Sequence, residues 1–201
     1  MDTKIQQQEK KGLYGGAMEI EIPTRFIDVS QFRQVPDHQE VFVDETSDQS
    51  VIIELLERQS HIEDNKSASF HFDTISDESD IPADGRIVFN HRPIDSAEMP
   101  HFTNETPKFL LFGQQKVAKF NETGSENIVN VYMAIVRLSK SQTDVLITLY
   151  HPILLCESSS SAKTVGSTKP DTLYSQPIVE QTFIKILQSF NIKDYSLFVH
   201  Q

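Results

Sequence analysis

Two carboxylates in the string Glu54-Leu-Leu-Glu57 are the side chains of this chain whose type and spacing best suit chemistry. If the segment ends in a helical turn, acids three residues apart lie on one face. Two such carboxylates can share a proton and act as general acid and base. They can equally belong to a hydrated acidic surface, or to a patch that docks a basic partner. Composition favours these two alternatives over catalysis, because no positioned arginine or pocket motif accompanies the pair.

Other reactive motifs are missing from the sequence. The segment Gly166-Ser-Thr-Lys169 lacks the glycine spacing and the preceding strand of a phosphate-binding loop. There is no G-x-S-x-G nucleophile motif, and no two of the seven histidines have metal-ligand spacing around a glutamate. Cys156 follows two leucines and is interpreted as a small buried hydrophobe rather than a reactive thiol. We therefore expect neither a catalytic nucleophile nor a metal or cofactor.

The acidic residues are concentrated in one quarter of the chain. Residues 28–80 hold fourteen acids and three bases, a net charge of −11, which equals the net charge of the whole chain. Such a concentration predicts a docking surface for a basic partner. The candidate binding residues are five carboxylates within and beside two short apolar runs: Asp28, Asp37, Glu40, Glu54 and Glu57.

Length and composition restrict the class of protein. A chain of 201 residues fits one domain, and a pI near 5.0 argues against nucleic acid as a partner. The longest apolar run, Ile153–Cys156, is far shorter than the roughly 20 residues that span a bilayer. One cysteine cannot form an internal disulfide, which suits a reducing compartment. We expect a monomer that lies in the cytosol or in the nucleus.

Several segments have the periodicity of strands. Residues 18–22 alternate between apolar side chains and glutamates, and the runs 40–43 and 50–56 flank a polar loop, which indicates a hairpin. The run 128–136 is almost entirely apolar, as in a central strand that is covered on both faces. Further strands are predicted at 87–89, 109–120, 128–138, 145–150 and 195–199.

Two segments have helical patterns, and two others are predicted to be flexible. Residues 67–76 are predicted to form one helix, and an apolar stripe from Val179 to Phe190 predicts a second that packs across the sheet. Residues 1–11 are predicted to be a flexible tail, and the serine-rich residues 157–171 a mobile loop. Residues 12–201 therefore form a single α+β domain with an antiparallel sheet covered by helices.

Several short strings resemble the Mog family of Ran-binding proteins, also described as Ran guanine-nucleotide release factors. They occur in order and at the family's spacing: Leu13-Tyr-Gly-Gly-Ala17, Phe26-Ile-Asp-Val-Ser30, Arg33-Gln-Val-Pro-Asp37, Gln39-Glu-Val-Phe-Val43 and Ser50-Val-Ile-Ile-Glu-Leu-Leu-Glu57. The resemblance implies a three-layer α/β/α fold with a central antiparallel sheet, shared with the PsbP-type photosystem proteins. It also implies binding to the GTPase Ran, release of its nucleotide, and a role in nuclear protein import.

The resemblance also bears on the candidate residues. Glu54 and Glu57 match the family string implicated in Ran binding, and Asp37 and Glu40 match its acidic surface. The alternative is a PsbP-like adaptor that uses the same surface for another protein and leaves nucleotide untouched.

Overall fold

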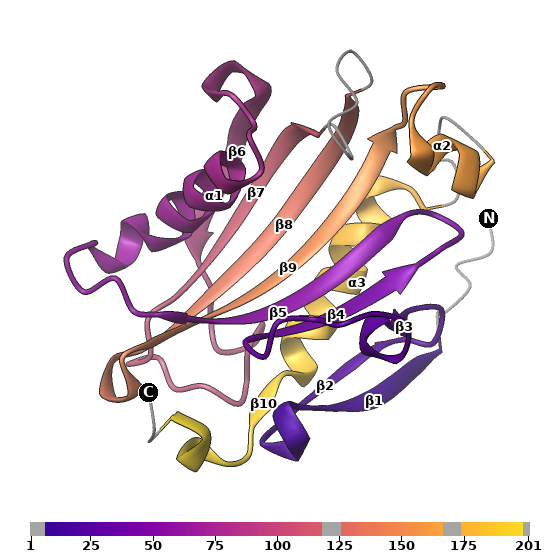
Figure 1. Cartoon of the computed structure of the whole chain (residues 1–201). Helices are drawn as coiled ribbons and strands as arrows, with labels where there is room; N and C mark the ends of the chain where they lie inside the picture. The colour runs from indigo at the N-terminus through magenta and orange to yellow at the C-terminus, as the bar shows by residue number, and fades with distance from the viewer. Residues whose placement is uncertain (1–6, 118–125, 167–173, 199–201) are drawn as a thin grey trace.

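A seven-stranded antiparallel sheet forms the centre of the molecule (Figure 1). The computed structural model describes residues 7–117, 126–166 and 174–198. Within them the strand order of this sheet is β3-β4-β5-β9-β8-β7-β6. Its strands are β3 (Ile27–Asp28), β4 (Gln39–Asp44), β5 (Gln49–Glu57), β6 (Arg86–Pro93), β7 (Lys108–Val117), β8 (Asn127–Leu138) and β9 (Thr143–Leu154).

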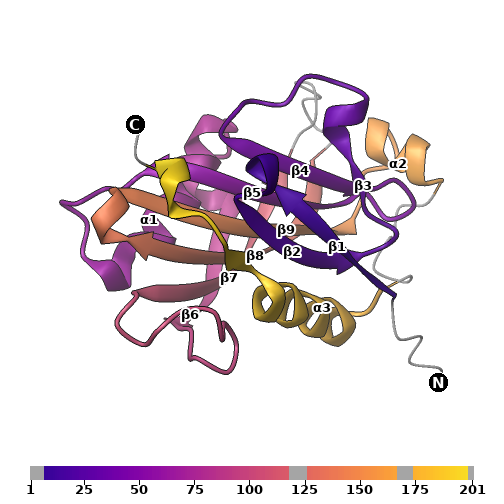
Figure 2. The same ribbon diagram turned by 90° about the horizontal axis from the view of Figure 1, so that it is seen from below.

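Helices cover both faces of this sheet. Helix α1 (Ser67–Glu78) packs on one face, mainly against β7 and β8. Helix α3 (Gln176–Ser189) packs on the other face, together with a three-stranded sheet (Figure 2). That smaller sheet has the order β1-β2-β10 and contains β1 (Gln8–Leu13), β2 (Met18–Pro23) and β10 (Asn191–Ile192). The predicted α+β class with three layers and a central antiparallel sheet is confirmed.

Side chains of β8 point alternately to the two faces of the sheet, and contribute to a hydrophobic core on each face. Val131, Met133 and Ile135 face α1, where they pack with Phe72. Tyr132, Ala134 and Val136 face α3, where they belong to the larger core. All of β8 except Ile128 is buried, which confirms the predicted central strand with two covered faces. No helix in the described part of the chain is long and apolar enough to cross a membrane.

The predicted flexible tail is shorter than expected. Strand β1 begins at Gln8 and pairs with β2 from Gln8 opposite Pro23 to Leu13 opposite Met18. The charged residues Glu9 and Lys10 obscure the apolar alternation by which a strand is predicted. An edge strand can expose such side chains while its backbone still forms hydrogen bonds. The prediction is therefore wrong for residues 8–11, and residues 1–6 lie outside the described residues.

The predicted serine-rich loop contains a short helix, α2 (Ser160–Val165). The Ser159 hydroxyl accepts a hydrogen bond from the Ala162 N–H at 3.1 Å, and Gly166 ends the helix with φ of +69°. Serine is a favoured helix N-cap and glycine a favoured C-terminal stop, so these residues encode a helix as well as a linker. The prediction is wrong for residues 160–165, and residues 167–171 lie outside the described residues.

Two other elements differ from the sequence predictions. Residues 195–198 form a 3-10 turn rather than a strand, and the last strand is β10. Strand β6 has eight residues rather than three and contains a bulge between Val88 and Asn90. Strand β6 lies close to β7 at Gly113. A Cβ atom at this position would be only 2.8 Å from the Ile87 carbonyl oxygen, so the close approach requires glycine.

Candidate protein-binding surface

The candidate acids of the β4–β5 hairpin are divided between the two faces of the sheet. In the hairpin register Gln39 pairs with Glu54, and Glu40 pairs with Ile53. Glu54 and Gln39 therefore share the face that α1 packs on, and Glu40 lies on the opposite face. Strand β5 stays extended through Glu57, so Glu54 and Glu57 also point to opposite faces. The helical turn that would place these two acids on one face does not form, so the structure does not bring them together to share a proton.

A tight turn from β1 into β2 holds Glu40. Tyr14, Gly15 and Gly16 all have positive φ, at +49°, +68° and +95°, a conformation that two consecutive glycines make accessible. The turn directs the Tyr14 backbone N–H to the Glu40 carboxylate, with an N–O distance of 2.6 Å. Burial raises the pKa of Glu40, the Tyr14 hydrogen bond opposes that rise, and the charge of Asp28 adds to it. Glu40 is thus a half-buried carboxylate that a neutral donor keeps in place.

Glu54 is held by its neighbours in the same hairpin. The Gln39 side-chain amide donates to the Glu54 carboxylate at 2.6 Å, and His38 Nε2 lies 3.4 Å from the same oxygen. The Tyr14 hydroxyl reaches the backbone carbonyls of His38 and Ile53, at 2.9 and 3.0 Å. Tyr14 therefore connects both strands of the hairpin as well as Glu40. We call these five residues, Tyr14, His38, Gln39, Glu40 and Glu54, the acidic cluster.

The other three candidates surround this hairpin. The Asp28 carboxylate caps a 3-10 turn by accepting from the Ser30 N–H at 2.8 Å. Asp37 is exposed in the segment that leads into β4, and Glu57 is exposed at the end of β5. Across the described residues, no lysine or arginine lies within ion-pair distance of Asp28, Asp37, Glu40, Glu54 or Glu57. Among the described residues, no lysine or arginine therefore neutralises these charges, and His38 beside Glu54 is the one histidine within ion-pair distance of them.

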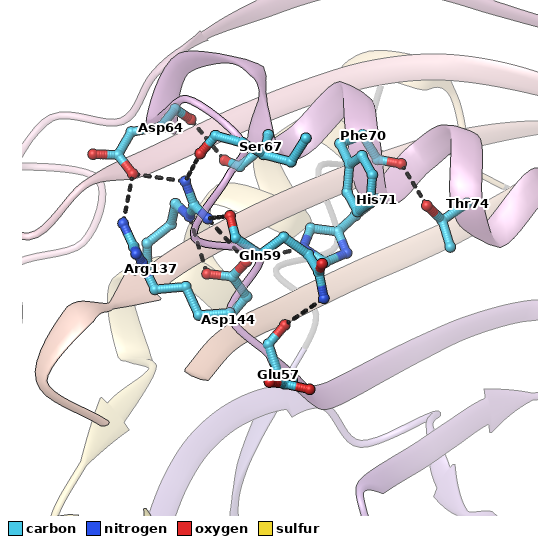
Figure 3. Close-up of polar contacts among 11 residues, drawn as sticks. Glu57, Gln59, Asp64, Ser67, Phe70, His71, Thr74, Arg137 and Asp144 are labelled. Atoms are coloured by element: carbon cyan, nitrogen blue, oxygen red, sulfur yellow. Dashed lines mark hydrogen bonds and ion pairs between the residues drawn. The ribbon is translucent and has the colours of Figure 1, made fainter. Parts of the chain in front are cut away.

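A second group of charged residues lies just beyond Glu57 (Figure 3). The fully buried Arg137 donates from Nε to Asp144 at 3.0 Å and from Nη1 to Asp64 at 2.7 Å. It also donates to the backbone carbonyls of Gln59 and Ile62, at 2.7 and 2.8 Å. These bonds fix the connection between β5 and α1 to the paired ends of β8 and β9. We call this set, with His71, the arginine network.

His71 completes the arginine network from α1. Its Nε2 lies 3.0 Å from the second oxygen of Asp144, and both side chains are buried. Burial opposes ionisation of Asp144, but the hydrogen bonds from His71 and Arg137 outweigh it and hold the pKa of Asp144 below its ordinary value. The sequence analysis missed this network. The available signal was Arg137 near the end of an otherwise apolar strand, with Asp144 across the following turn.

The described residues contain no group of three or more His, Cys, Asp or Glu side chains able to hold a metal ion. What the surface presents is a set of positioned carboxylates on a rigid hairpin.

Residues 11–152 match the model of the Ran-interacting Mog1 protein family. The chain belongs to the Mog1 family. It is 52% identical over 192 residues to a Dictyostelium discoideum protein named probable ran guanine nucleotide release factor, covering 96% of this chain and 97% of that one. It is 28% identical to the Schizosaccharomyces pombe protein named nuclear import protein mog1, covering 92% of this chain and 98% of the relative.

Solved structures show the same fold. The Saccharomyces cerevisiae Ran-binding protein Mog1p has a TM-score of 0.69 at 23% identity, covering 96% of this chain and 99% of that one. The cyanobacterial PsbP of Synechocystis has a TM-score of 0.51 at 14% identity, covering 96% of both chains. The three-layer Mog1 architecture therefore extends to PsbP, as a likeness of fold.

Proposed function

We propose that this chain binds the small GTPase Ran through its acidic surface and promotes release of the bound guanine nucleotide, in support of nuclear protein import. Membership of the Mog1 family and the names of its relatives support Ran as the partner. The observation that carries the assignment of the surface is that its five carboxylates have no lysine or arginine partner among the described residues. The proposed contacts are Glu54, Glu57, Asp37, Glu40 and Asp28.

The geometry of the acidic cluster suits recognition of a basic protein. Glu54 and Glu40 are held by hydrogen bonds from neutral groups, so little side-chain entropy is lost when a partner binds them. Their charges remain available, because an amide or N–H donor satisfies a carboxylate without cancelling its charge. Asp37 and Glu57 are exposed on either side and extend the negative potential around the hairpin.

Nucleotide release needs no catalytic nucleophile in this chain. A protein that binds nucleotide-free Ran more tightly than loaded Ran lowers nucleotide affinity by the same factor, because the two equilibria are linked. The carboxylates of the acidic cluster would attract a lysine or arginine of Ran and draw it away from the nucleotide phosphates. We accordingly propose a monomeric binding protein rather than an enzyme, acting in the nucleus and in the cytoplasm.

The rate at which labelled nucleotide leaves purified Ran tests this proposal. Glu54→Lys and Glu57→Lys should each lower affinity for Ran at least tenfold, since reversing a central charge in a protein interface costs about 2–5 kcal/mol. Nucleotide release should fall in parallel. The matched control is Glu45→Lys, which reverses an exposed acid in the turn at the other end of the same hairpin. Wild-type release rates in folded Glu54→Lys and Glu57→Lys proteins would contradict the assigned surface.

Ionic strength gives a second measurement on the wild-type protein. If unneutralised carboxylates steer the encounter, the association rate with Ran should fall as salt rises from low to physiological concentration. A rate that does not change with salt would count against the acidic surface. Binding that leaves nucleotide release unchanged would support the adaptor function instead.

A further inference from the structure

Strand β6 forms the edge of the large sheet opposite β3, and in the described part of the chain it pairs only with β7 (Figure 1). Three consecutive large apolar side chains at its centre are exposed: Ile87 by 52%, Val88 by 39% and Phe89 by 52%. The outward N–H and C=O groups of an edge strand can pair with another strand. Soluble proteins commonly protect such edges with lysine or proline, and the centre of β6 has neither.

A row of aromatic rings runs from this edge into the core. The distance between ring centroids is 5.2 Å from Phe89 to Phe112 and 4.8 Å from Phe112 to Tyr132. It is 6.0 Å from Tyr132 to Phe183 of α3. The bulge after Val88 lets Phe89 contact Phe112. Phe112, Tyr132 and Phe183 also line a cavity of about 190 Å³ between the sheet and α3. The exposed edge therefore continues into a concave, largely apolar site.

The cavity has a polar group that the described residues do not satisfy. Tyr132 is 3% exposed, and its hydroxyl makes no hydrogen bond of ordinary geometry with them. Burial raises the pKa of Tyr132, and the nearby Asn130 opposes that rise, but its amide group does not lie in ordinary hydrogen-bond geometry with the hydroxyl. A buried hydroxyl without a partner is uncommon and costs free energy. A ligand that donates to or accepts from this hydroxyl would recover that cost.

Both ends of β6 are flanked by excess negative charge. At one end the guanidinium of Arg86 pairs with Asp73 and Asp77, and Glu78, Asp80 and Asp84 lie nearby in the sequence. At the other end the Arg92 guanidinium is held by Glu98, at 2.6 and 2.7 Å. Asp95 and, at the cavity, Glu180 add further acids. A complementary ligand therefore has an apolar centre and basic ends.

From these observations we propose that the β6 edge binds an extended segment of a partner protein by adding it to the sheet as an eighth strand. The segment carries a bulky apolar side chain that enters the cavity beside Tyr132, and lysine or arginine residues at both ends. Main-chain hydrogen bonds to the edge would supply affinity, and the cavity would supply specificity. This site lies at the opposite edge of the sheet from β3 and β4, and it does not rest on the proposed binding of Ran.

A labelled synthetic peptide, Lys-Lys-Val-Thr-Phe-Thr-Val-Lys-Lys, tests the proposal by fluorescence anisotropy with the full chain. It should bind with a Kd below about 1 mM. Phe89→Lys, which puts a cation on the edge, should weaken binding at least tenfold. The matched control Phe32→Lys changes a 73% exposed aromatic residue remote from β6 and should leave binding unchanged. Amide chemical-shift changes on titration should centre on residues 86–93.

The cavity is tested separately with a second peptide, in which alanine replaces the central phenylalanine. Wild-type protein should prefer the phenylalanine peptide at least fivefold. Ile184→Phe, which fills the cavity from α3, should bind both peptides equally while keeping its thermal midpoint within a few degrees.

Three results would overturn the proposal. They are no binding of the first peptide at 1 mM, equal loss with Phe89→Lys and Phe32→Lys, and a concentration-dependent dimer that Phe89→Lys abolishes. The last would show that a second copy of this chain occupies the edge. Nucleotide release from Ran by Phe89→Lys should equal that of wild type, so failure here is distinguishable from failure of the proposed function.

Discussion

The acidic cluster and the arginine network both contain carboxylates near β5, yet their partners differ in kind. In the network, Asp144 and Asp64 are bonded to the fully buried guanidinium of Arg137. In the cluster, Glu40 and Glu54 accept from a backbone N–H and a side-chain amide. Charges paired with an arginine cancel, whereas charges held by neutral donors persist. The comparison separates carboxylates that hold the fold from carboxylates positioned to attract another molecule.

The largest expected effect comes from breaking the arginine network. Asp144→Asn keeps the shape of the side chain but removes the fully buried counter-charge of Arg137, which then retains only the partly exposed Asp64 among the described residues. Removing one partner of a buried ion pair typically costs about 3–5 kcal/mol, so the free energy of unfolding should fall by that amount. Urea unfolding measures it, with Asp37→Asn as an exposed control expected to change stability by less than about 0.5 kcal/mol. A loss of under about 1 kcal/mol would show that the network is not structural.

The arginine network also predicts how the stability of the protein changes at acidic pH. Because the pKa of Asp144 is lower in the folded protein than the ordinary value of 3.8, its ionised form stabilises the fold above pH 3.8. That contribution should be lost as pH falls from 3.8 through the folded pKa. Asp144→Asn should lack this part of the acid transition.

A smaller loss of stability is expected from changing Tyr14, which lies in the turn before β2 and belongs to the acidic cluster. Tyr14→Phe removes the hydroxyl that reaches the carbonyls of His38 and Ile53, which should cost about 1–2 kcal/mol. It leaves the Tyr14 N–H bond to Glu40 in place. Thermal unfolding checks the stability. If the hydroxyl also orders the hairpin for its partner, affinity for Ran should fall more than the unbound protein's stability alone would explain.

Glu40 should show the opposite pH behaviour from Asp144. Its pKa is raised by burial, so the folded state takes up a proton more readily than the unfolded state. Ionised Glu40 therefore lowers stability at neutral pH, and stability should rise as pH falls through its folded pKa. Glu40→Gln can still accept from the Tyr14 N–H and should remove this dependence. A larger pH dependence in the variant would contradict this assignment of charge.

The smallest effect is expected at Glu57. Because its side chain is exposed at the end of β5, Glu57→Gln should change the free energy of unfolding by less than about 0.5 kcal/mol. Chemical denaturation measures this change. A loss comparable to that of Asp144→Asn would place Glu57 in the arginine network and remove it from the proposed surface.

Periodicity predicted most of the fold because the core strands and both long helices are strongly patterned. The run Ile128–Leu138 and the stripe from Val179 to Phe190 specify buried elements by hydrophobicity alone. The pattern failed where polar residues form structure through the backbone, as in β1, or through capping, as with Ser159 in α2. It also left open how Glu54 and Glu57 lie, since a helical turn would place them on one face and the extended strand places them on opposite faces.

Charge and cross-strand partners were harder to predict. The sequence located the acidic quarter of the chain, but not which carboxylates are neutralised. That distinction depends on Arg137, which lies more than 70 residues from Asp64 and is brought to it only by the sheet. Likewise nothing local links Tyr14 to Glu40. Contacts between distant segments decide which acids remain available.

The pairing of β2 with β10 has a consequence for synthesis on the ribosome. Met18 and Glu19 pair with Ile192 and Asn191, and the N–H groups of Lys193 and Asp194 donate to the Ala17 carbonyl. The partner strand of β2 therefore leaves the ribosome about 170 residues after β2 itself, long after domains begin to fold during synthesis. Until then the apolar face of β2 lacks both β10 and α3. The apolar face of β2 is therefore covered by α3 and β10 only after all strands of the central sheet have been synthesised.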